Sequence, residues 1–513
     1  MILPAPVAWL ILGVTAITLG LLLPFAFHRL HLLRIAARGR SIPGLESGDM
    51  AGVSGTSDAL PRVTVQLPLY NEAAVVERLL DAVALLAYPR DRLEIQVLDD
   101  STDETVARAR ARTETWRSRG IPMEHLRRGS REGFKAGALQ WGMERARGEF
   151  FLILDADFIP DSDLIRRLLP SFRDRGVGMV QARWDHLNEE ASLLTRCQAL
   201  LLDAHFFFEQ GGRYATGCFL NFNGTAGMWR RSALEEAGGW SSDTLTEDLD
   251  VSYRAQMAGW RFVFLSGVGV AAELPESPRA LEVQQKRWAQ GGIQTGRKLL
   301  GPLWRGPWSL RVKMEGTVHL LGHLAHPLTL GLGVLLLPSA VARESLGLRG
   351  LLHLDLMVFT LATLSFLTFY VSAGRVRRRP WRRLVPTAVA TLALGVGLTA
   401  PVSRSVLRGL RSNVSDPFLR TPKQGQDRAP IYAAPSIRGD GLLRAVLLTW
   451  MLACIGLAVH WGYLGSLPFL VLFTFGWGWM ALGRQAGAEP ESPAKAARRQ
   501  PEAVTLGGAS SGA

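Results

Sequence analysis

Long apolar runs lie near the two ends of the chain, and a polar, patterned region lies between them. That central region has about 250 residues, a size typical of one globular domain. A helix needs about 20 apolar residues to cross a bilayer, and residues 7–27 contain no charged residue. Further apolar runs occupy 317–341, 351–373, 384–403, 442–461 and 463–483. The pattern predicts a multi-pass membrane protein.

The basic residues around the first apolar run predict its orientation. None precedes residues 7–27, whereas Arg29, Arg34, Arg38 and Arg40 follow it. A cleaved signal peptide has its basic residues in front and a shorter apolar core. We therefore expect an uncleaved anchor with its N-terminus outside, because basic flanks stay in the cytoplasm. The central domain would then be cytoplasmic, at the inner membrane of the cell.

The run 384–403 is the weakest candidate span. If it crossed the bilayer, the strongly basic segment 404–440 would lie outside the cell, against the positive-inside rule. Extended to Leu410, it has the polar, basic end of a helix that lies in the membrane interface. We therefore expect 384–410 to lie along the cytoplasmic surface, which leaves five spans. Composition alone leaves open whether 384–403 crosses the membrane.

In the central region, short β-type runs alternate with amphipathic helical patterns. The expected strands are 63–68, 94–98, 150–154 and 177–182. The expected helices lie near 73–86, 103–118, 133–147 and 161–173. This alternation predicts an α/β domain with a mostly parallel sheet covered by helices.

Acidic residues follow two of these strands. Asp99 and Asp100 come after 95–98, and Asp155 and Asp157 come after 151–154. In open α/β sheets, ligands bind beyond the carboxyl ends of strands. A helix N-cap is the alternative role for such residues. Two acids one residue apart at a strand exit favour a hard divalent cation instead.

Charge and cysteine content narrow the class further. Much of the net charge of +13 sits in arginine runs beside apolar segments, as at 375–383, where basic residues face anionic lipid headgroups. The chain has no nucleic-acid-binding motif, so no nucleic-acid partner is expected. Its cysteines, Cys197, Cys218 and Cys454, form no Cys-x-x-Cys pair, which is typical of a reducing compartment.

Five short motifs occur in a fixed order: Pro68–Glu72, Asp99–Ser101, Asp155–Asp157, Thr246–Asp248 and Gln284–Trp288. In order and spacing the chain resembles processive family 2 glycosyltransferases, in particular cellulose synthase-like and glucomannan (mannan) synthase-like enzymes, from about residue 62 to 425. The resemblance implies a GT-A type nucleotide-sugar-binding domain inserted between transmembrane helices. No cyclic-dinucleotide-binding domain follows the spans, unlike in bacterial cellulose synthase.

The resemblance implies a donor site with a divalent cation, Mg²⁺ or Mn²⁺. Asp157, with Asp155, would hold the metal and the donor diphosphate, since a hard cation prefers carboxylate oxygens. Arg287 would stabilise the leaving diphosphate through two parallel hydrogen bonds. Lys135 is a second cation for the donor; the alternative is a solvated helix lysine.

The remaining donor contacts also come from the resemblance. Glu72 and Asp100 would contact the nucleoside or its base, and Asp99 would support the ribose. Base and hydroxyl selectivity depend on pocket shape, so the sequence leaves UDP-glucose and GDP-mannose both open as donors.

On the acceptor side, the resemblance assigns the general base to Asp248, with Glu247 beside it in the catalytic motif. Asp250 competes with Asp248 on spacing alone. A single base with in-line attack implies inversion, so an α-linked donor would give a β-linkage.

Four further residues are assigned to the acceptor. Gln284 and Trp288 belong to the motif that accompanies polymer synthesis in relatives, and Trp288 could stack on a sugar. The alternative for Trp288 is a buried core tryptophan. Gly224 and Thr225 lie in a segment that lines the acceptor pocket of relatives.

A segment near residue 420 resembles the cytoplasmic gating loop of cellulose synthase-like enzymes. Thr421 and Lys423 match it, whereas Arg420 stands where relatives often have an apolar residue. The expected partners are a nucleotide-sugar donor, a polysaccharide or oligosaccharide acceptor and membrane lipid. The sequence leaves any export partner unknown.

Three functions remain in competition. A processive polysaccharide synthase leads, and transfer of one sugar to a lipid acceptor, such as polyprenyl phosphate or diacylglycerol, is the alternative. An inactive scaffold or transporter subunit would have lost the acids at the metal and base positions, which are all present.

The expected organisation combines these patterns. It comprises an anchor with a basic flank (1–40), a linker (41–60), the catalytic domain (61–300), an interfacial helix region (301–316), two spans (317–373), an interfacial helix with a gating-like loop (374–440), two spans (441–483) and a disordered tail (484–513).

Overall fold

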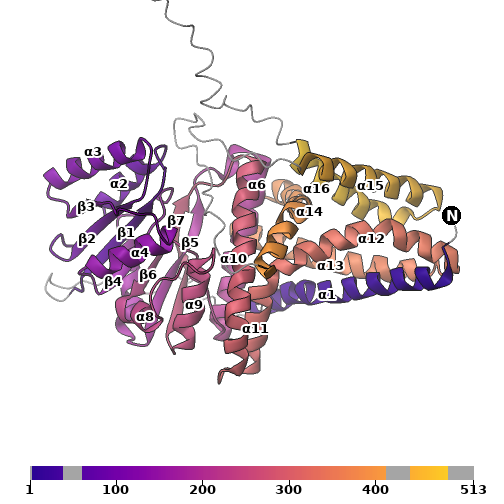
Figure 1. Cartoon of the computed structure of the whole chain (residues 1–513), viewed down its shortest axis with the longest axis horizontal. Coiled ribbons are helices and arrows are strands. Elements are labelled where there is room, and N and C mark those ends of the chain that lie inside the picture. Colours follow the sequence, from indigo (N-terminus) through magenta and orange to yellow (C-terminus); the bar gives the residue numbers. More distant parts are fainter. Residues whose placement is uncertain (1–2, 38–59, 412–439, 483–513) are drawn as a thin grey trace, which may run out of the picture.

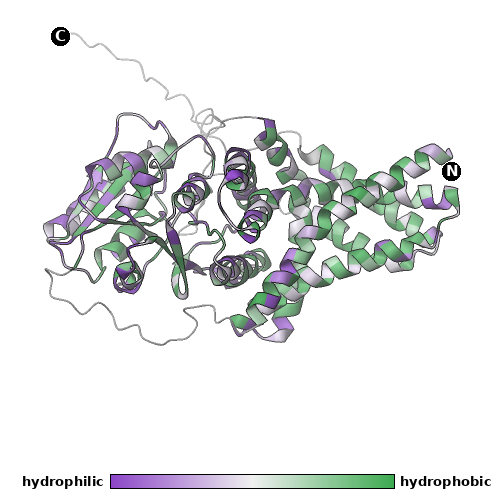
Figure 2. Cartoon of the chain, turned by 90° about the horizontal axis from the view of Figure 1, so that it is seen from below, coloured by the Kyte–Doolittle hydropathy of each residue, from purple (hydrophilic) through white to green (hydrophobic). Residues whose placement is uncertain are grey.

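The computed structural model describes residues 3–37, 60–411 and 440–482. It has a sheet domain at one end and a bundle of long helices at the other, with the N-terminus at the far end of that bundle (Figure 1). Figure 2 shows the long helices as almost continuously hydrophobic, whereas hydrophobic and hydrophilic residues alternate in the sheet domain.

The domain is built on one seven-stranded sheet in the order β3-β2-β1-β4-β6-β5-β7. Its strands are β1 (Val63–Leu69), β2 (Leu93–Asp99), β3 (Met123–Leu126), β4 (Phe150–Ile153), β5 (Val177–His186), β6 (Gly227–Arg230) and β7 (Arg261–Ala272). Among the seven strands, β6 is the one that pairs antiparallel, with β4 and β5, and the other strand pairs are parallel. The prediction of an α/β domain with a mostly parallel sheet is confirmed.

Each face of the sheet carries a separate hydrophobic core, because neighbouring residues of a strand point to opposite faces. Val65 and Leu67 pack with Leu79 of α2 (Val76–Ala84) and Leu168 of α5 (Leu164–Leu168) on one face. On the other face, β4 packs against the helices α4 (Phe134–Arg145), α8 (Arg231–Glu236) and α9 (Glu247–Met257). Burial on both faces explains why β4 is a continuous apolar run.

The four predicted strands are present as β1, β2, β4 and β5, and β5 is longer than predicted. The predicted helices correspond to α2, α3 (Thr105–Ser118), α4, and α5 with the short helix η2 (Leu169–Arg173). Strands β3, β6 and β7 were not predicted. In β7 the buried and more exposed residues alternate along much of the strand, and this period-2 signal is visible in its sequence.

Helices join the domain to the long helices of the bundle. Next to the domain lie α6 (Leu193–Ala204), the π-helix η4 (His205–Gln210), α7 (Gly211–Thr216) and α10 (Pro278–Arg305). The long helices are α1 (Ala5–Ala37), α11 (Leu310–Leu321), α12 (Ala325–Leu346), α13 (Leu351–Val376), α14 (Trp381–Arg411), α15 (Asp440–His460) and α16 (Leu467–Leu482). Because α10 is continuous, it runs through the domain boundary predicted at residue 300.

Six helical segments of the described residues are long and apolar enough to cross a membrane, and α14 is one of them. Its most apolar stretch is 67% buried within the protein, compared with 11–28% for the other five. Helix α14 packs between α10 on the domain side and α16 in the bundle. Figure 1 shows it at the junction of the two parts. The interfacial location of 384–410 stays a prediction.

Candidate active site

One pocket gathers most of the predicted site residues at the carboxyl ends of the strands. It has a volume of about 170 Å³. The predicted residues on its wall are Glu72, Asp100, Lys135, Asp155, Asp157, Gly224, Glu247, Asp248, Gln284, Arg287 and Trp288. Asp99 and Thr225 lie behind this wall, and Thr421 and Lys423 fall outside the described residues.

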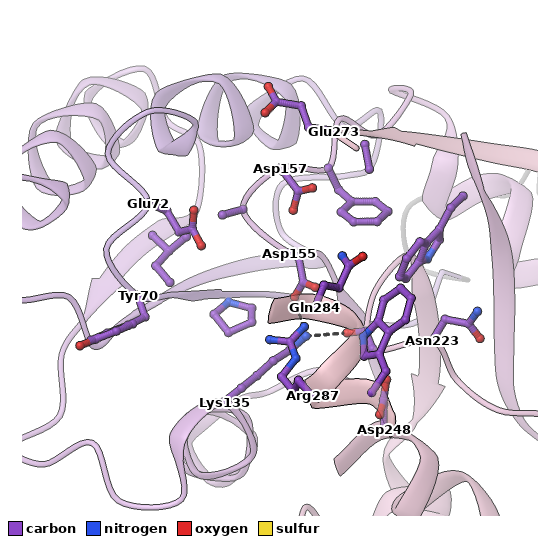
Figure 3. A pocket seen from close by; sticks show the side chains of 18 of the residues that line it. Tyr70, Glu72, Lys135, Asp155, Asp157, Asn223, Asp248, Glu273, Gln284 and Arg287 are labelled. Carbon is purple, nitrogen blue, oxygen red and sulfur yellow. Dashed lines mark hydrogen bonds and ion pairs between the residues drawn. The ribbon is translucent and has the colours of Figure 1, made fainter. Parts of the chain in front are cut away.

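The two aspartates predicted to bind metal lie in the loop that follows β4 (Figure 3). The backbone N–H of Asp155 donates to the Thr225 hydroxyl at 2.9 Å, so the buried Thr225 fixes this loop rather than touching a ligand. The Asp157 residue is only 7% exposed yet lines the pocket.

Lys135 extends into this pocket from the first turn of α4. The turn before α4 requires Gly133, whose φ of +69° is one that glycine adopts freely. The Lys135 ammonium donates to Asp155 Oδ1 at 2.5 Å and to the Gly224 carbonyl at 2.9 Å. Burial lowers the pKa of Lys135, but Asp155 and Glu247 outweigh burial, so its pKa is raised. The alternative of a solvated helix lysine is therefore wrong.

Asp99 and Asp100 have different surroundings although they are adjacent. Asp100 receives two hydrogen bonds from Arg128, at 2.8 and 2.6 Å, and lines the pocket. Asp99 is buried and accepts hydrogen bonds from His125 and from the Ser101 N–H, both at 2.8 Å. Burial alone would raise the pKa of Asp99, but these hydrogen bonds outweigh it and lower the pKa. Asp99 therefore holds the end of β2 rather than facing the pocket.

A stacked pair that the sequence did not single out lies on the same wall. The Arg131 guanidinium carbon is 3.3 Å from the centre of the Tyr70 ring, and both residues line the pocket. A guanidinium over an aromatic face forms a flat, cationic surface, suited to planar or anionic groups. Tyr70 lies inside a recognised motif, whereas no local pattern marks Arg131.

Asp248 lies in the first turn of α9 beside the buried Glu247, and is itself partly exposed to the pocket. Burial, followed by the negative charge of Glu247, raises the pKa of Asp248 to about 7. Gly224 approaches it closely: a Cβ there would lie 2.9 Å from Asp248 Oδ2, at a φ of +84°. A carboxylate whose pKa is near neutrality is suited to accept a proton from a substrate hydroxyl.

Asp250, the competitor for this role, points elsewhere. It is fully buried and forms ion pairs with Arg254 at 2.7 Å and Lys298 at 2.7 Å. It does not line the pocket. Its place in an ion-pair cluster leaves Asp248 as the acid that can reach a substrate.

The third group of site residues comes from α10, which begins at Ser277 as N-cap with Pro278 in the first turn. Gln284, Arg287 and Trp288 share one helical face because they are three and four residues apart. All three line the pocket, and Figure 3 shows Gln284 and Arg287 reaching into it. Trp288 is half-buried, so the alternative of a core tryptophan is wrong.

Two further aromatic residues complete the wall next to Trp288. The Trp184 ring centre is 6.4 Å from that of Trp288 and 5.3 Å from that of Phe158. Such rings can cover the apolar faces of a sugar. Trp184 belongs to the part of β5 that extends beyond the predicted strand, which explains why the sequence reading missed it.

The ligand atoms that the pocket offers to a metal fit a divalent cation. Asp155 and Asp157 offer hard carboxylate oxygens, which Mg²⁺ and Mn²⁺ prefer. Within residues 3–37, 60–411 and 440–482, no cluster of three or more His, Cys, Asp or Glu forms a closed metal site. A metal held by few protein ligands leaves coordination positions for phosphate oxygens of a substrate.

Comparison with known proteins identifies the domain. Residues 61–291 match the family model described as "Glycosyltransferase like family 2". Residues 61–291 form a family 2 glycosyltransferase domain. The five motifs lie within these residues, so the resemblance seen in the sequence is confirmed.

The curated relatives of this glycosyltransferase domain are plant proteins. Glucomannan 4-beta-mannosyltransferase 1 of Oryza sativa subsp. japonica is 39% identical over 299 residues, which are 56% of this chain and 57% of the relative. Glucomannan 4-beta-mannosyltransferase 2 of Arabidopsis thaliana is 43% identical over 249 residues, 48% of this chain and 47% of the relative. The chain thus spans about half the length of the curated relatives it matches.

Among solved structures, a mannosyltransferase of Pyrobaculum calidifontis in complex with GDP-Man and Mn²⁺ matches 79% of this chain and 99% of its own, with a TM-score of 0.48 and 22% identity.

Proposed function

We propose that the protein is a membrane-bound, inverting glycosyltransferase that polymerises a hexose from a nucleotide-sugar donor into a β-linked polysaccharide. One observation carries the proposal: the Asp248 carboxyl, whose pKa is raised to about 7, lines the same pocket as Asp155 and Asp157. A proton acceptor and a diphosphate site in one cavity are what glycosyl transfer needs.

In the proposed reaction, Asp248 takes the proton of the acceptor hydroxyl as its oxygen attacks the anomeric carbon. The bond between that carbon and the donor diphosphate breaks, and the diphosphate leaves with the electron pair. Attack from the side opposite the leaving group inverts the anomeric carbon. Burial, followed by the negative charge of Glu247, keeps the pKa of Asp248 high enough for this proton transfer.

The cationic side chains of the pocket stabilise the leaving group. Arg287 offers two parallel N–H groups to phosphate oxygens, and Lys135 is kept protonated by its carboxylate neighbours. A divalent cation, held by Asp157 and Asp155, would neutralise the diphosphate charge when bound. Glu72, Asp100 and the Tyr70–Arg131 pair would contact the nucleoside.

The names of the relatives favour a mannosyl donor, so we propose GDP-mannose ahead of UDP-glucose and a 4-linked product. On the acceptor side, Trp288 and Trp184 would stack on the growing chain, and Gln284 would hydrogen-bond to it. We further propose that the domain faces the cytoplasm and that the bundle beside the pocket passes the polymer across the membrane.

Radiolabel transfer tests this proposal. Membranes holding the protein are given labelled GDP-mannose or UDP-glucose, with Mg²⁺, Mn²⁺ or EDTA, and product length is read on a gel. We expect long, metal-dependent polymer from GDP-mannose, absent in Asp248→Asn and present in Asp243→Asn. Asp243 is the matched control, because it pairs with Lys298 outside the pocket.

Other outcomes would redirect the proposal. Label confined to a short, organic-soluble product would establish transfer to a lipid acceptor instead of polymer synthesis. Polymer from UDP-glucose alone would assign a glucosyl donor. Equal incorporation by Asp248→Asn and wild type would contradict the assigned base.

A further inference from the structure

A second cavity lies on the membrane side of the protein and shares no lining residue with the active-site pocket. Its volume is about 270 Å³. It is enclosed by the end of α1 nearest the domain, by α7 and by α11. Its walls include Phe27, His28, Arg213, Arg311, Met314 and Glu315.

The floor of this cavity is a buried ion-pair cluster. The Glu315 carboxylate accepts a hydrogen bond from Arg213 Nε at 3.1 Å and contacts His28 Nε2 at 2.9 Å. Both oxygens of Glu315 are therefore used, and Arg213 and Glu315 are almost completely covered by protein. Glu315 is the carboxylate on the cavity wall, and Glu209 lies behind it, 3.9 Å from Arg213 Nη2.

The Arg213 guanidinium has one nitrogen, Nη1, that the ion-pair cluster does not use. Arg213 is only 3% exposed, yet within the described part of the chain its Nη1 has no hydrogen-bond partner. Leaving a buried N–H group of a charged side chain unpaired is costly, because the group has lost its water without gaining an acceptor. An anionic oxygen placed in the cavity would remove this cost.

The rim adds a second guanidinium and an apolar surface. Arg311 is exposed, and its Nη1 donates to the Thr216 carbonyl at 3.3 Å, which holds the side chain near the cavity. Phe27 and Met314, each 53% exposed, flank the same opening. Both residues belong to helical segments that are apolar enough to span a membrane, so their side chains are suited to contact with lipid hydrocarbon.

We propose that this cavity binds the headgroup of an anionic membrane phospholipid. The lipid phosphate accepts hydrogen bonds from Arg213 Nη1 and Arg311, and the acyl chains lie over Phe27 and Met314. Guanidinium groups bind phosphate oxygens well, and anionic lipids concentrate at basic ends of cytoplasmic helices. The apolar rim selects a phospholipid over free phosphate, which has no hydrocarbon to bury. This site does not depend on the proposed glycosyl transfer.

The test is lipid binding to the full chain purified in detergent, followed by native mass spectrometry. The probes are phosphatidylglycerol, phosphatidylcholine and inorganic phosphate. The variants are Arg311→Gln, which removes a rim charge, and Val318→Trp, which fills the cavity. Lys313→Gln is the matched control, since it removes a charge from α11 outside the cavity wall. Arg213 is left unchanged, because replacing one member of a buried ion pair endangers folding.

We expect wild type and Lys313→Gln to retain phosphatidylglycerol in preference to phosphatidylcholine. One basic residue near an anionic lipid is worth a change of about fivefold in affinity, so Arg311→Gln should weaken phosphatidylglycerol binding by that factor. Val318→Trp should abolish the specific complex. Equal binding of the two lipids, or binding by Val318→Trp as tight as in the control, would overturn the proposal. Displacement of the lipid by millimolar phosphate would assign the site to a free anion instead.

Discussion

The two sides of the active-site pocket carry the same chemical group in opposite electrostatic settings. On the strand-end side, Asp100 is paired with Arg128 and Asp155 with Lys135. On the α9 side, Asp248 lies beside another carboxylate, Glu247, and burial together with that charge raises its pKa to about 7. Asp100 and Asp155 each lie against a cation, whereas burial beside a like charge makes Asp248 able to take up a proton near neutral pH. One pocket can therefore hold a diphosphate and accept a proton.

The largest expected effects on activity come from replacing one carboxylate on each side of the pocket. A general base contributes about 10²–10⁴-fold to rate, so Asp248→Asn should lower kcat by that factor at every metal concentration. Asp157→Asn should instead raise the Mn²⁺ concentration needed for half-maximal rate. Initial rates against Mn²⁺ concentration measure both. If saturating Mn²⁺ restored Asp248→Asn, the proposed division between the two sides would fail.

The second prediction concerns pH. Asp248 must be deprotonated to act as a base, and its pKa of about 7 means that it becomes protonated as the pH falls through neutrality. The rate should therefore rise about tenfold per pH unit below 7 and level off above it. The residual activity of Asp248→Asn should not show this rise with pH. A wild-type rate that stayed level from pH 5 to 8 would contradict the assignment.

Gly224→Ala tests the close approach to the base with a smaller effect. The new Cβ would lie 2.9 Å from Asp248 Oδ2, and the residue would have to adopt a φ of +84°. Displacing a base by a few tenths of an ångström lowers rate by about 10–10²-fold. We expect this loss in kcat with little change in donor KM. Gly217→Ala, at a φ of +66° with open space around it, is the control for backbone strain alone.

The smallest effect on activity is expected from Asp99→Asn. Asp99 is bonded behind the pocket wall and its folded-state pKa is lowered. Its contribution to stability is therefore present above its unfolded pKa of about 4 and is lost as pH falls through the folded value. We expect the variant to unfold at a lower temperature than wild type at pH 7, with the gap narrowing as the pH falls below about 4. A kcat loss as large as that of Asp248→Asn would place Asp99 in direct contact with substrate.

The sequence predicted the parts of the site that lie on strand ends and in compact motifs. Asp155 and Asp157 follow a buried strand, and Gln284 and Arg287 share a helical face, so local patterns suffice to bring them together. The pairing of Asp100 with Arg128 depends instead on two loops that only the folded sheet brings into contact.

Two other features could not be predicted from local sequence patterns. The sequence does not distinguish Asp99 from Asp100, because which of two adjacent residues faces inward depends on the twist and end of β2. The antiparallel β6 was missed because its four residues are too few to show a period, and the structure places it between β4 and β5.

Helix α10 has a practical consequence for anyone who wishes to isolate the domain. It supplies one wall of the pocket, and its buried Ala289 and Ile293 belong to the same apolar cluster as Leu394 and Val402 of α14. A fragment ending near residue 300 would keep the wall but leave this surface bare to water. We expect such a fragment to aggregate or to lose the orientation of Arg287, so biochemistry on the excised domain would understate what the whole protein does.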